Sequence, residues 1–166
     1  KPAAVELPAQ VVPGSETSKK LAAAPAVDTS AVDSAAADDG PLDPAVMASG
    51  QASYLICGAC HGQNGEGGPI APPLAASEWV TGPVSNLIRI QLRGLQGPIT
   101  VAGKEYNMPG GMAALAYQTD DQIAAVLTFI RNSFGNKASA VKPEQVAALR
   151  SEVGKPQITV EELTKP

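Results

Sequence analysis

The sequence predicts an all-α fold of about four to five helices, with one short β-hairpin and a long irregular N-terminal tail. Three observations support this prediction. Apolar residues recur at helical spacing in three separate stretches, near residues 44–57, 84–95 and 120–131. Residues that favour helix ends, such as Asp, Thr, Pro and Gly, bound these stretches. The first forty residues repeat Ala and Pro and contain no aromatic side chain, so they lack a core-forming pattern.

Residues 1–42 differ in composition from the rest of the chain and are expected to be an Ala/Pro/Asp-rich linker or tether. Residues 1–43 hold three Lys and seven Asp or Glu, a net charge of −4 that equals the net charge of the whole chain. Such a segment cannot bury enough apolar surface to offset the entropy of ordering it. We expect a tether to a membrane anchor or partner subunit; the alternative is an extension that binds nothing.

The folded domain is expected over residues 43–136, and its helices have identifiable starts. Asp43 and Pro44 suit the N-cap and first position of a helix that continues into the residues near 57. Pro83 opens a second helix with an apolar face. Thr119 and Gln122 form a capping-box pattern before the third, which has the clearest periodicity.

The remaining elements are shorter. Residues 99–106 predict a hairpin that turns at Ala102 and Gly103. Residues 137–166 are expected to be a C-terminal extension with one short helix, over 143–153. The last segment, 154–166, is expected to be a loosely attached tail.

The central motif is Cys57-Gly58-Ala59-Cys60-His61, which contains the only cysteines and the only histidine of the chain. Two cysteines separated by two residues and followed at once by histidine indicate covalent attachment of haem c. Each thiol forms a thioether bond with one vinyl group of the haem, and the imidazole binds the iron. The predicted cofactor is therefore one covalently bound haem c.

Other roles for the two cysteines fit less well. A zinc site would need two more Cys or His ligands, and only His61 is left. A thioredoxin-like redox pair would follow a strand, whereas the residues before Cys57 have helical periodicity. A free or disulfide-bonded structural pair is the remaining alternative.

Further residues are candidates for the haem site. Met108 and Met112 lie in a Gly-rich loop that can approach a porphyrin, and a thioether is a common second ligand beside histidine. We expect Met108, held extended by the following proline, to be the distal ligand, with Met112 as the alternative. The carbonyl of Pro72 is expected to accept the free ring N–H of His61, unless this run is an ordinary proline turn. Trp79 is expected to pack on the haem edge and donate to a propionate, or to be core.

Composition excludes several classes of protein. Lys and Arg do not cluster, so we expect no nucleic-acid binding. No apolar run approaches the roughly 20 residues that span a bilayer. The chain starts at Lys1 without an initiator Met or visible signal peptide, and we interpret it as a mature or trimmed form.

Together these residues resemble a class I c-type cytochrome over residues 43–135. The resemblance rests on the Cys-X-X-Cys-His motif, the run Pro72-Pro73-Leu74, Met108 with Pro109, and the final helix from Asp120. It implies a small cytochrome c fold around one haem, with Cys57 and Cys60 as attachment sites, His61 as proximal ligand, Pro72 as its support and Met108 as distal ligand. Residues 128–136 are also similar to haem domains attached to bacterial quinoprotein dehydrogenases and respiratory complexes.

The function that this resemblance implies is single-electron transfer in a bacterial periplasm, by a carrier that is not an enzyme. The expected partners are redox proteins: a dehydrogenase, a quinol-oxidising complex or a terminal oxidase. The chain could be a free carrier or a domain of a larger complex, tethered to the membrane through its N-terminal segment. The alternative function is a haem enzyme or gas-binding sensor with an open distal site, which the lack of a second histidine disfavours.

Overall fold

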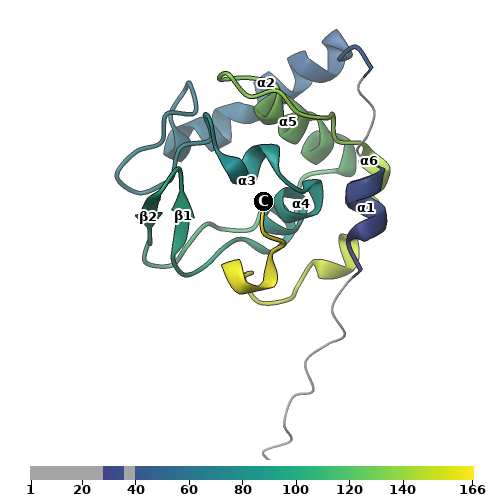
Figure 1. Ribbon diagram of the computed structural model, residues 1–166. Helices are drawn as coiled ribbons and strands as arrows, with labels where there is room; N and C mark the ends of the chain where they lie inside the picture. The colour runs from purple at the N-terminus through teal and green to yellow at the C-terminus, as the bar shows by residue number, and fades with distance from the viewer. Residues whose placement is uncertain (1–27, 36–39) are drawn as a thin grey trace, which may run out of the picture.

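Helices dominate the computed structural model, which describes residues 28–35 and 40–166 of the chain (Figure 1). Six α-helices, two short 3-10 helices and one two-stranded antiparallel sheet occur within these ranges. The α-helices are α1 (Ser30–Ser34), α2 (Pro44–His61), α3 (Glu78–Thr81), α4 (Val84–Arg93), α5 (Asp120–Arg131) and α6 (Pro143–Ala148). The strands are β1 (Ile99–Val101) and β2 (Lys104–Tyr106), and the 3-10 helices are η1 (Arg150–Glu152) and η2 (Val160–Glu162). The all-α prediction is confirmed.

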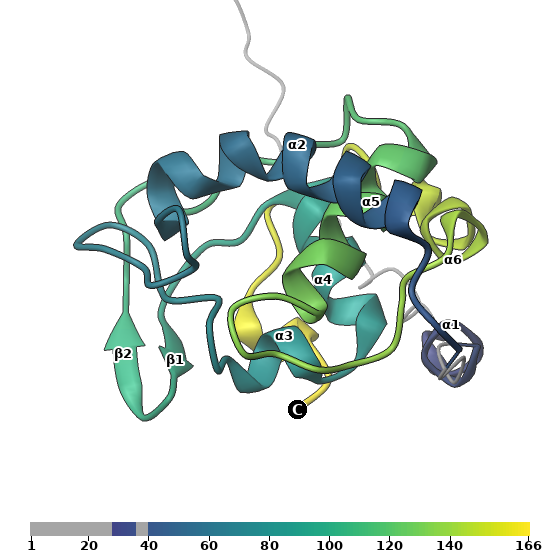
Figure 2. The ribbon, with the colours of Figure 1, turned by 90° about the horizontal axis from the view of Figure 1, so that it is seen from above.

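Helices α2 and α5 form the main crossing of the domain, with α2 passing over α5 in the view of Figure 2. Asp43 caps α2 by accepting a hydrogen bond from the backbone of Ala45, as the sequence predicts. The Thr119 capping box at the start of α5 is also confirmed. The crossing brings Tyr54 of α2 against Phe129 of α5, with the ring centroids 5.6 Å apart.

Helix α4 lies in the middle of the molecule and supplies much of its core (Figure 2). Ile88 and Leu92 are buried against Ile123 and Leu127 of α5. Gly94 ends the helix with a φ of 75°, a conformation that glycine adopts without strain. The opposite side of α4, through Ile90, contributes to a second and smaller apolar cluster.

The hairpin forms where the sequence predicts it, at the end of the molecule opposite α1 (Figures 1 and 2). Ile99 pairs with Tyr106, and Val101 pairs with Lys104. Ala102 and Gly103 both have positive φ values, 49° and 77°, as in the tight turns that suit two-residue hairpin loops.

Part of the predicted N-terminal linker belongs to the folded domain. Helix α1 packs against α4, and its Val32 is only 6 % exposed. Asp33 accepts hydrogen bonds from the backbone and hydroxyl of Ser85, at the start of α4. The expectation of a linker is thus wrong for residues 30–34. For residues 1–27 and 36–39 it lies outside the described residues.

The prediction of a loosely attached C-terminal tail is wrong. Ile158 is fully buried, and its backbone bonds to Gly94 and Gln96 beside the end of α4. Leu163 is also buried, and the backbone of Thr164 is bonded to Asn86. The segment is therefore a fixed strap across α4. The predicted short helix over 143–153 is present as α6 followed by η1.

No helix in residues 28–35 and 40–166 combines the length and apolar character needed to cross a membrane.

Candidate functional site

One large apolar cavity, of about 230 Å³, opens at the carboxyl end of α2. Its walls come from that end of α2, from α3 and the loop before it, from α4 and α5, from β1 and from the loop at 112–115. Most of the lining is aliphatic. The lining residues named in the sequence analysis are Cys57, Cys60, His61, Pro72, Trp79 and Met112.

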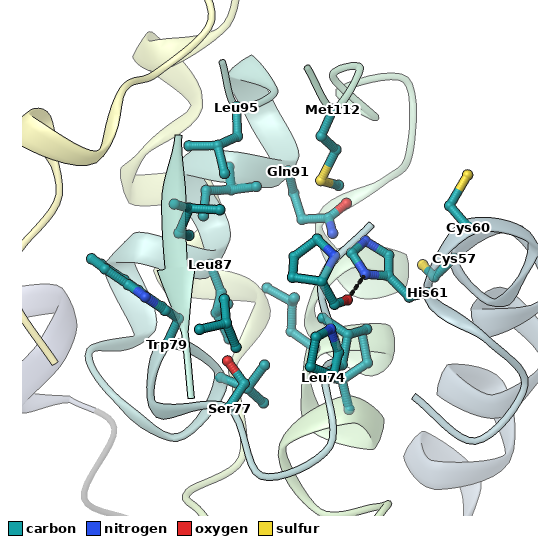
Figure 3. Close-up of a pocket in the computed structure, with 18 of the residues that line it drawn as sticks. Cys57, Cys60, His61, Leu74, Ser77, Trp79, Leu87, Gln91, Leu95 and Met112 are labelled. Carbon is teal, nitrogen blue, oxygen red and sulfur yellow. Dashed lines mark hydrogen bonds between the residues drawn. The ribbon is translucent and has the colours of Figure 1, made fainter. Parts of the chain in front are cut away.

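The last turn of α2 brings the two thiols and the imidazole together (Figure 3). Residues three and four apart share one face of a helix, so Cys57, Cys60 and His61 all reach the cavity. Both cysteines are free thiols; Cys57 is buried and Cys60 is exposed. Burial raises the pKa of the Cys57 thiol, so this sulfur stays protonated at neutral pH.

The ring of His61 is held by the loop that follows it. Its Nδ1 atom lies 2.7 Å from the carbonyl oxygen of Pro72, the hydrogen bond that the sequence predicts (Figure 3). A carbonyl only accepts, so Nδ1 carries the hydrogen and the Nε2 lone pair is available to a metal. Burial lowers the pKa of His61, and the bond to Pro72 partly opposes this shift. The lowered pKa suits an imidazole that binds a metal in its neutral form, and the bond to Pro72 fixes which nitrogen carries the hydrogen.

The loop between His61 and Pro72 is held in place by hydrogen bonds that its backbone carbonyls accept from α2 and from the residues after Pro72. The hydroxyl of Tyr54 donates to the carbonyl of Gly62, at 2.7 Å. The carbonyl of Gly65 accepts from the backbone N–H groups of Leu74 and Ala75, at 2.8 and 2.9 Å. Burial, followed by the nearby Cys57 and Glu66, raises the pKa of Tyr54 to about 12, so its hydroxyl remains a donor at physiological pH. These bonds fix the direction from which Pro72 reaches the imidazole.

Met112 extends into the cavity from a separate element (Figure 3). Its backbone exchanges two hydrogen bonds with Leu95, at 3.0 and 2.7 Å, just past the end of α4. The side-chain amide of Gln157 donates to the carbonyls of Gly110 and Met112, at 3.1 and 2.9 Å. The strap and α4 therefore hold this methionine from two sides.

Met108 lies outside the cavity that contains His61. Its side chain is 38 % exposed and lines a second hollow, between residues 68–70 and β2 with the residues after it. Only Met112 of the two loop methionines lines the cavity that contains His61. The structure thus separates the two methionines that the sequence left as alternatives.

Trp79 lines the cavity, but its indole N–H is hydrogen-bonded to another part of the polypeptide. It donates to the backbone carbonyl of Thr100 in β1, at 2.8 Å, and so joins α3 to the hairpin. The ring also packs against the small cluster around Ile90 and Ile158. In this structure the N–H group is therefore used by the hairpin, and the expected bond to a propionate would have to replace that contact.

Gln91 is a cavity residue that the sequence analysis missed. Its side chain is 5 % exposed, and its amide oxygen has no hydrogen-bond partner within the described residues. The sequence contained one sign of this role: Gln91 is a polar residue four positions from both Leu87 and Leu95, on the apolar face of a predicted helix.

These features fit a covalently attached haem. Two free thiols and an imidazole with a free Nε2 stand at the cavity, and a thioether extends into it from another element. The aliphatic walls suit a flat apolar ring. The fold and the cavity define the class as a small helical protein with covalently attached haem.

Comparison with known proteins supports this class. The chain matches the family described as Cytochrome c over residues 47–134. Cytochrome c-552 of Thermus thermophilus is 41 % identical over 129 residues, which cover 72 % of this chain and 97 % of that protein. A second cytochrome c-552 of Thermus thermophilus is also 41 % identical over 129 residues, which cover 86 % of its length. This chain belongs to the cytochrome c family: it is a c-type cytochrome that binds haem c covalently and transfers electrons to and from redox partners.

Proposed function

We propose that this cytochrome is a carrier of single electrons, without enzymatic activity, whose haem iron is bound by His61 and Met112. The observation that carries this proposal is the position of Met112, which lines the same cavity as His61 while Met108 lies outside it. A thioether and an imidazole together fill both axial positions of a haem iron. When bound, the haem supplies a one-electron couple, and the protein's own residues tune it.

The other site residues have supporting roles in this proposal. Cys57 and Cys60 form the two thioether bonds, which fits their spacing on the last turn of α2. Pro72 accepts the Nδ1–H of His61, which orients the ring and increases the electron density at Nε2. The exposed Cys60 supports this side of the molecule as the place where electrons would enter and leave, because a haem bonded to this sulfur would have an edge near solvent.

An electron carrier needs no open position at the iron, whereas a haem enzyme or gas sensor does. Met112 is held in the cavity by Leu95 and Gln157, so it competes with any external ligand. This arrangement favours the carrier over the haem enzyme or gas-binding sensor.

We place the protein in a bacterial periplasm, where it passes electrons between a dehydrogenase or quinol-oxidising complex and an acceptor such as a terminal oxidase. The net charge of −4 supports short-lived docking that is steered only toward basic partner surfaces. The Ala- and Pro-rich residues before α1 suit a tether to a membrane anchor or to a larger complex.

The test is a comparison of Met112→Ala with Met108→Ala, each produced with haem-maturation machinery. Methionine–iron bonding gives a weak band at the red end of the spectrum of the oxidised protein. We expect Met112→Ala to lose this band, to bind carbon monoxide when reduced, and to have a lower reduction potential. Met108→Ala is the matched control and should keep the wild-type spectrum. Loss of the band in Met108→Ala, with its retention in Met112→Ala, would refute the assignment.

A further inference from the structure

Arg131, the last residue of α5, carries a positive charge into the interior. The residue is only 3 % exposed, and its guanidinium donates to the carbonyls of Val80, Gly82 and Ser139, at 2.7, 2.8 and 2.9 Å. All three acceptors are neutral, and no carboxylate lies within ion-pair distance of Arg131 in residues 28–35 and 40–166. Buried charges are normally paired with an opposite charge at close range, so this arrangement needs an explanation.

The guanidinium of Arg131 lies next to the wall of the haem cavity. Val80, whose carbonyl accepts from Arg131, lines this cavity, and so does Ile130, the neighbour of Arg131 in α5. Leu127, one turn earlier in the helix, lines it as well. Arg131 itself is not a lining residue, so apolar wall residues separate its charge from the space for the ring. Such a medium screens a charge far less than water does.

A carboxylate from α1 lies at the same turn of the chain. Asp33 bonds to the backbone and hydroxyl of Ser85, while Arg131 bonds to the carbonyl of Gly82, three residues earlier. Both charges are therefore fixed on the connection between α3 and α4. Burial lowers the pKa of the Arg131 guanidinium, and the negative charge of Asp33 opposes this shift. An arginine keeps its charge at physiological pH, so the two groups attract each other across the turn without direct contact.

We propose that Arg131 and Asp33 set the reduction potential of the haem by their charges: Arg131 raises it, and Asp33 offsets part of that rise. This inference deepens the proposed function and rests on its one-electron couple, not on which methionine binds the iron. Helix α1, which supplies Asp33, precedes residues 47–134 of the family domain. The docking of α1 therefore adds a charge that lowers the potential, and a protein whose α1 is displaced has the higher potential.

The direction of each effect follows from the charge of the iron. The oxidised haem has one more positive charge than the reduced haem, so a fixed positive charge nearby disfavours the oxidised form. Arg131 thus raises the potential, and Asp33 lowers it. Salt screens buried charges much less than exposed ones, so both effects should persist at high ionic strength. A purely structural role for these residues would not give shifts of opposite sign.

The experiment is a redox titration of Arg131→Gln and Asp33→Asn, each as the haem-loaded full chain. Both substitutions remove one charge and keep a side chain that can form hydrogen bonds. At a fixed applied potential, we expect Arg131→Gln to lower the ratio of reduced to oxidised protein about fivefold. Asp33→Asn should raise the same ratio about twofold, because its charge only offsets part of the effect of Arg131.

Lys137→Gln and Asp28→Asn are the matched controls, because they remove the same charges from exposed positions. Both should leave the ratio close to that of the wild type, since water and salt screen exposed charges. Arg131→Lys keeps the positive charge and should have a higher ratio than Arg131→Gln.

The proposal is overturned if Arg131→Gln and Asp33→Asn shift the potential in the same direction, or by no more than the two controls do. If Arg131→Gln does not fold, Asp33→Asn still decides the question. A raised potential in Asp33→Asn supports the proposal, and an unchanged or lowered one overturns it. A wild-type protein that does not take up and release one electron reversibly would instead refute the proposed carrier function.

Discussion

Gly50 of α2 lies directly against Phe129 of α5: a Cβ atom at position 50 would come within 2.6 Å of the Cβ of Phe129. The same atom would also collide with the backbone carbonyl of Ala125. We expect Gly50→Val to destabilise the protein by on the order of 2–3 kcal/mol, because the two helices must move apart. Denaturant unfolding of the haem-loaded variant measures this loss.

Ser49→Val is the control for this substitution. Ser49 is exposed on the same helix, so the variant tests the cost of a β-branched residue in α2 without the collision. We expect a change of less than about 0.5 kcal/mol at this position. Similar losses in the two variants would mean that the crossing does not depend on the small size of residue 50.

Glu152 should make the stability of the protein sensitive to acid. Burial alone would raise the pKa of this carboxyl, but hydrogen bonds from Lys155, Arg89 and Arg93 outweigh burial and lower its pKa to about 2. The folded pKa is below the ordinary value of 4.5, so the stabilisation is present above pH 4.5 and is lost as the pH falls toward 2. The loss is on the order of 3 kcal/mol.

Unfolding free energies between pH 7 and pH 3, for the wild type and Glu152→Gln, test this prediction. The variant should be about 3 kcal/mol less stable at pH 7, because the buried Arg93 and the partly buried Arg89 lose their shared carboxylate, and it should respond less to acid. Glu105→Gln, which removes an exposed carboxylate from β2, is the control and should follow the wild type. Parallel pH profiles for wild type and Glu152→Gln would show that other groups cause the acid sensitivity.

The elements that the sequence predicted are those with local signals. The Asp43 cap, the Thr119 capping box and the hairpin turn each involve residues no more than a few positions apart, and the Cys-X-X-Cys-His motif is five consecutive residues. Short-range patterns of this kind specify helix ends and turns without knowledge of the tertiary structure.

The elements that it missed depend on distant partners. The amide of Gln145 donates to the carbonyl of Val32, 113 residues away, and no local pattern contains that pairing. Met108 and Met112 are four residues apart in one glycine-rich loop, so spacing could not distinguish them. The distinction comes from the two backbone bonds between Met112 and Leu95, which only the folded chain reveals.

The docking of α1 predicts a measurable contribution from Asp33. Its carboxylate accepts from the backbone and the hydroxyl of Ser85, both at 2.8 Å, and so caps α4 from a different part of the chain. Loss of a helix cap costs about 1 kcal/mol, and we expect Asp33→Ala to lower the unfolding free energy by that amount. Asp28→Ala is the control, because the Asp28 carboxylate bonds only locally, to Ser30. If both variants match the wild type, α1 does not stabilise the domain.

Ile158 is expected to stabilise both the fold and the methionine loop. It is fully buried in the small cluster that includes Ile90 and Leu163, and Met112 packs against the same cluster. Ile158→Ala should cost about 2–4 kcal/mol by leaving a cavity. Because the lost packing adjoins Met112, the methionine–iron band of the oxidised protein should disappear at a lower temperature than global unfolding.

Val153→Ala, at a position that is 45 % exposed, should change neither quantity. A variant of Ile158 in which the band and the fold are lost together, at the same temperature, would show that the strap supports the domain as a whole and not the methionine in particular.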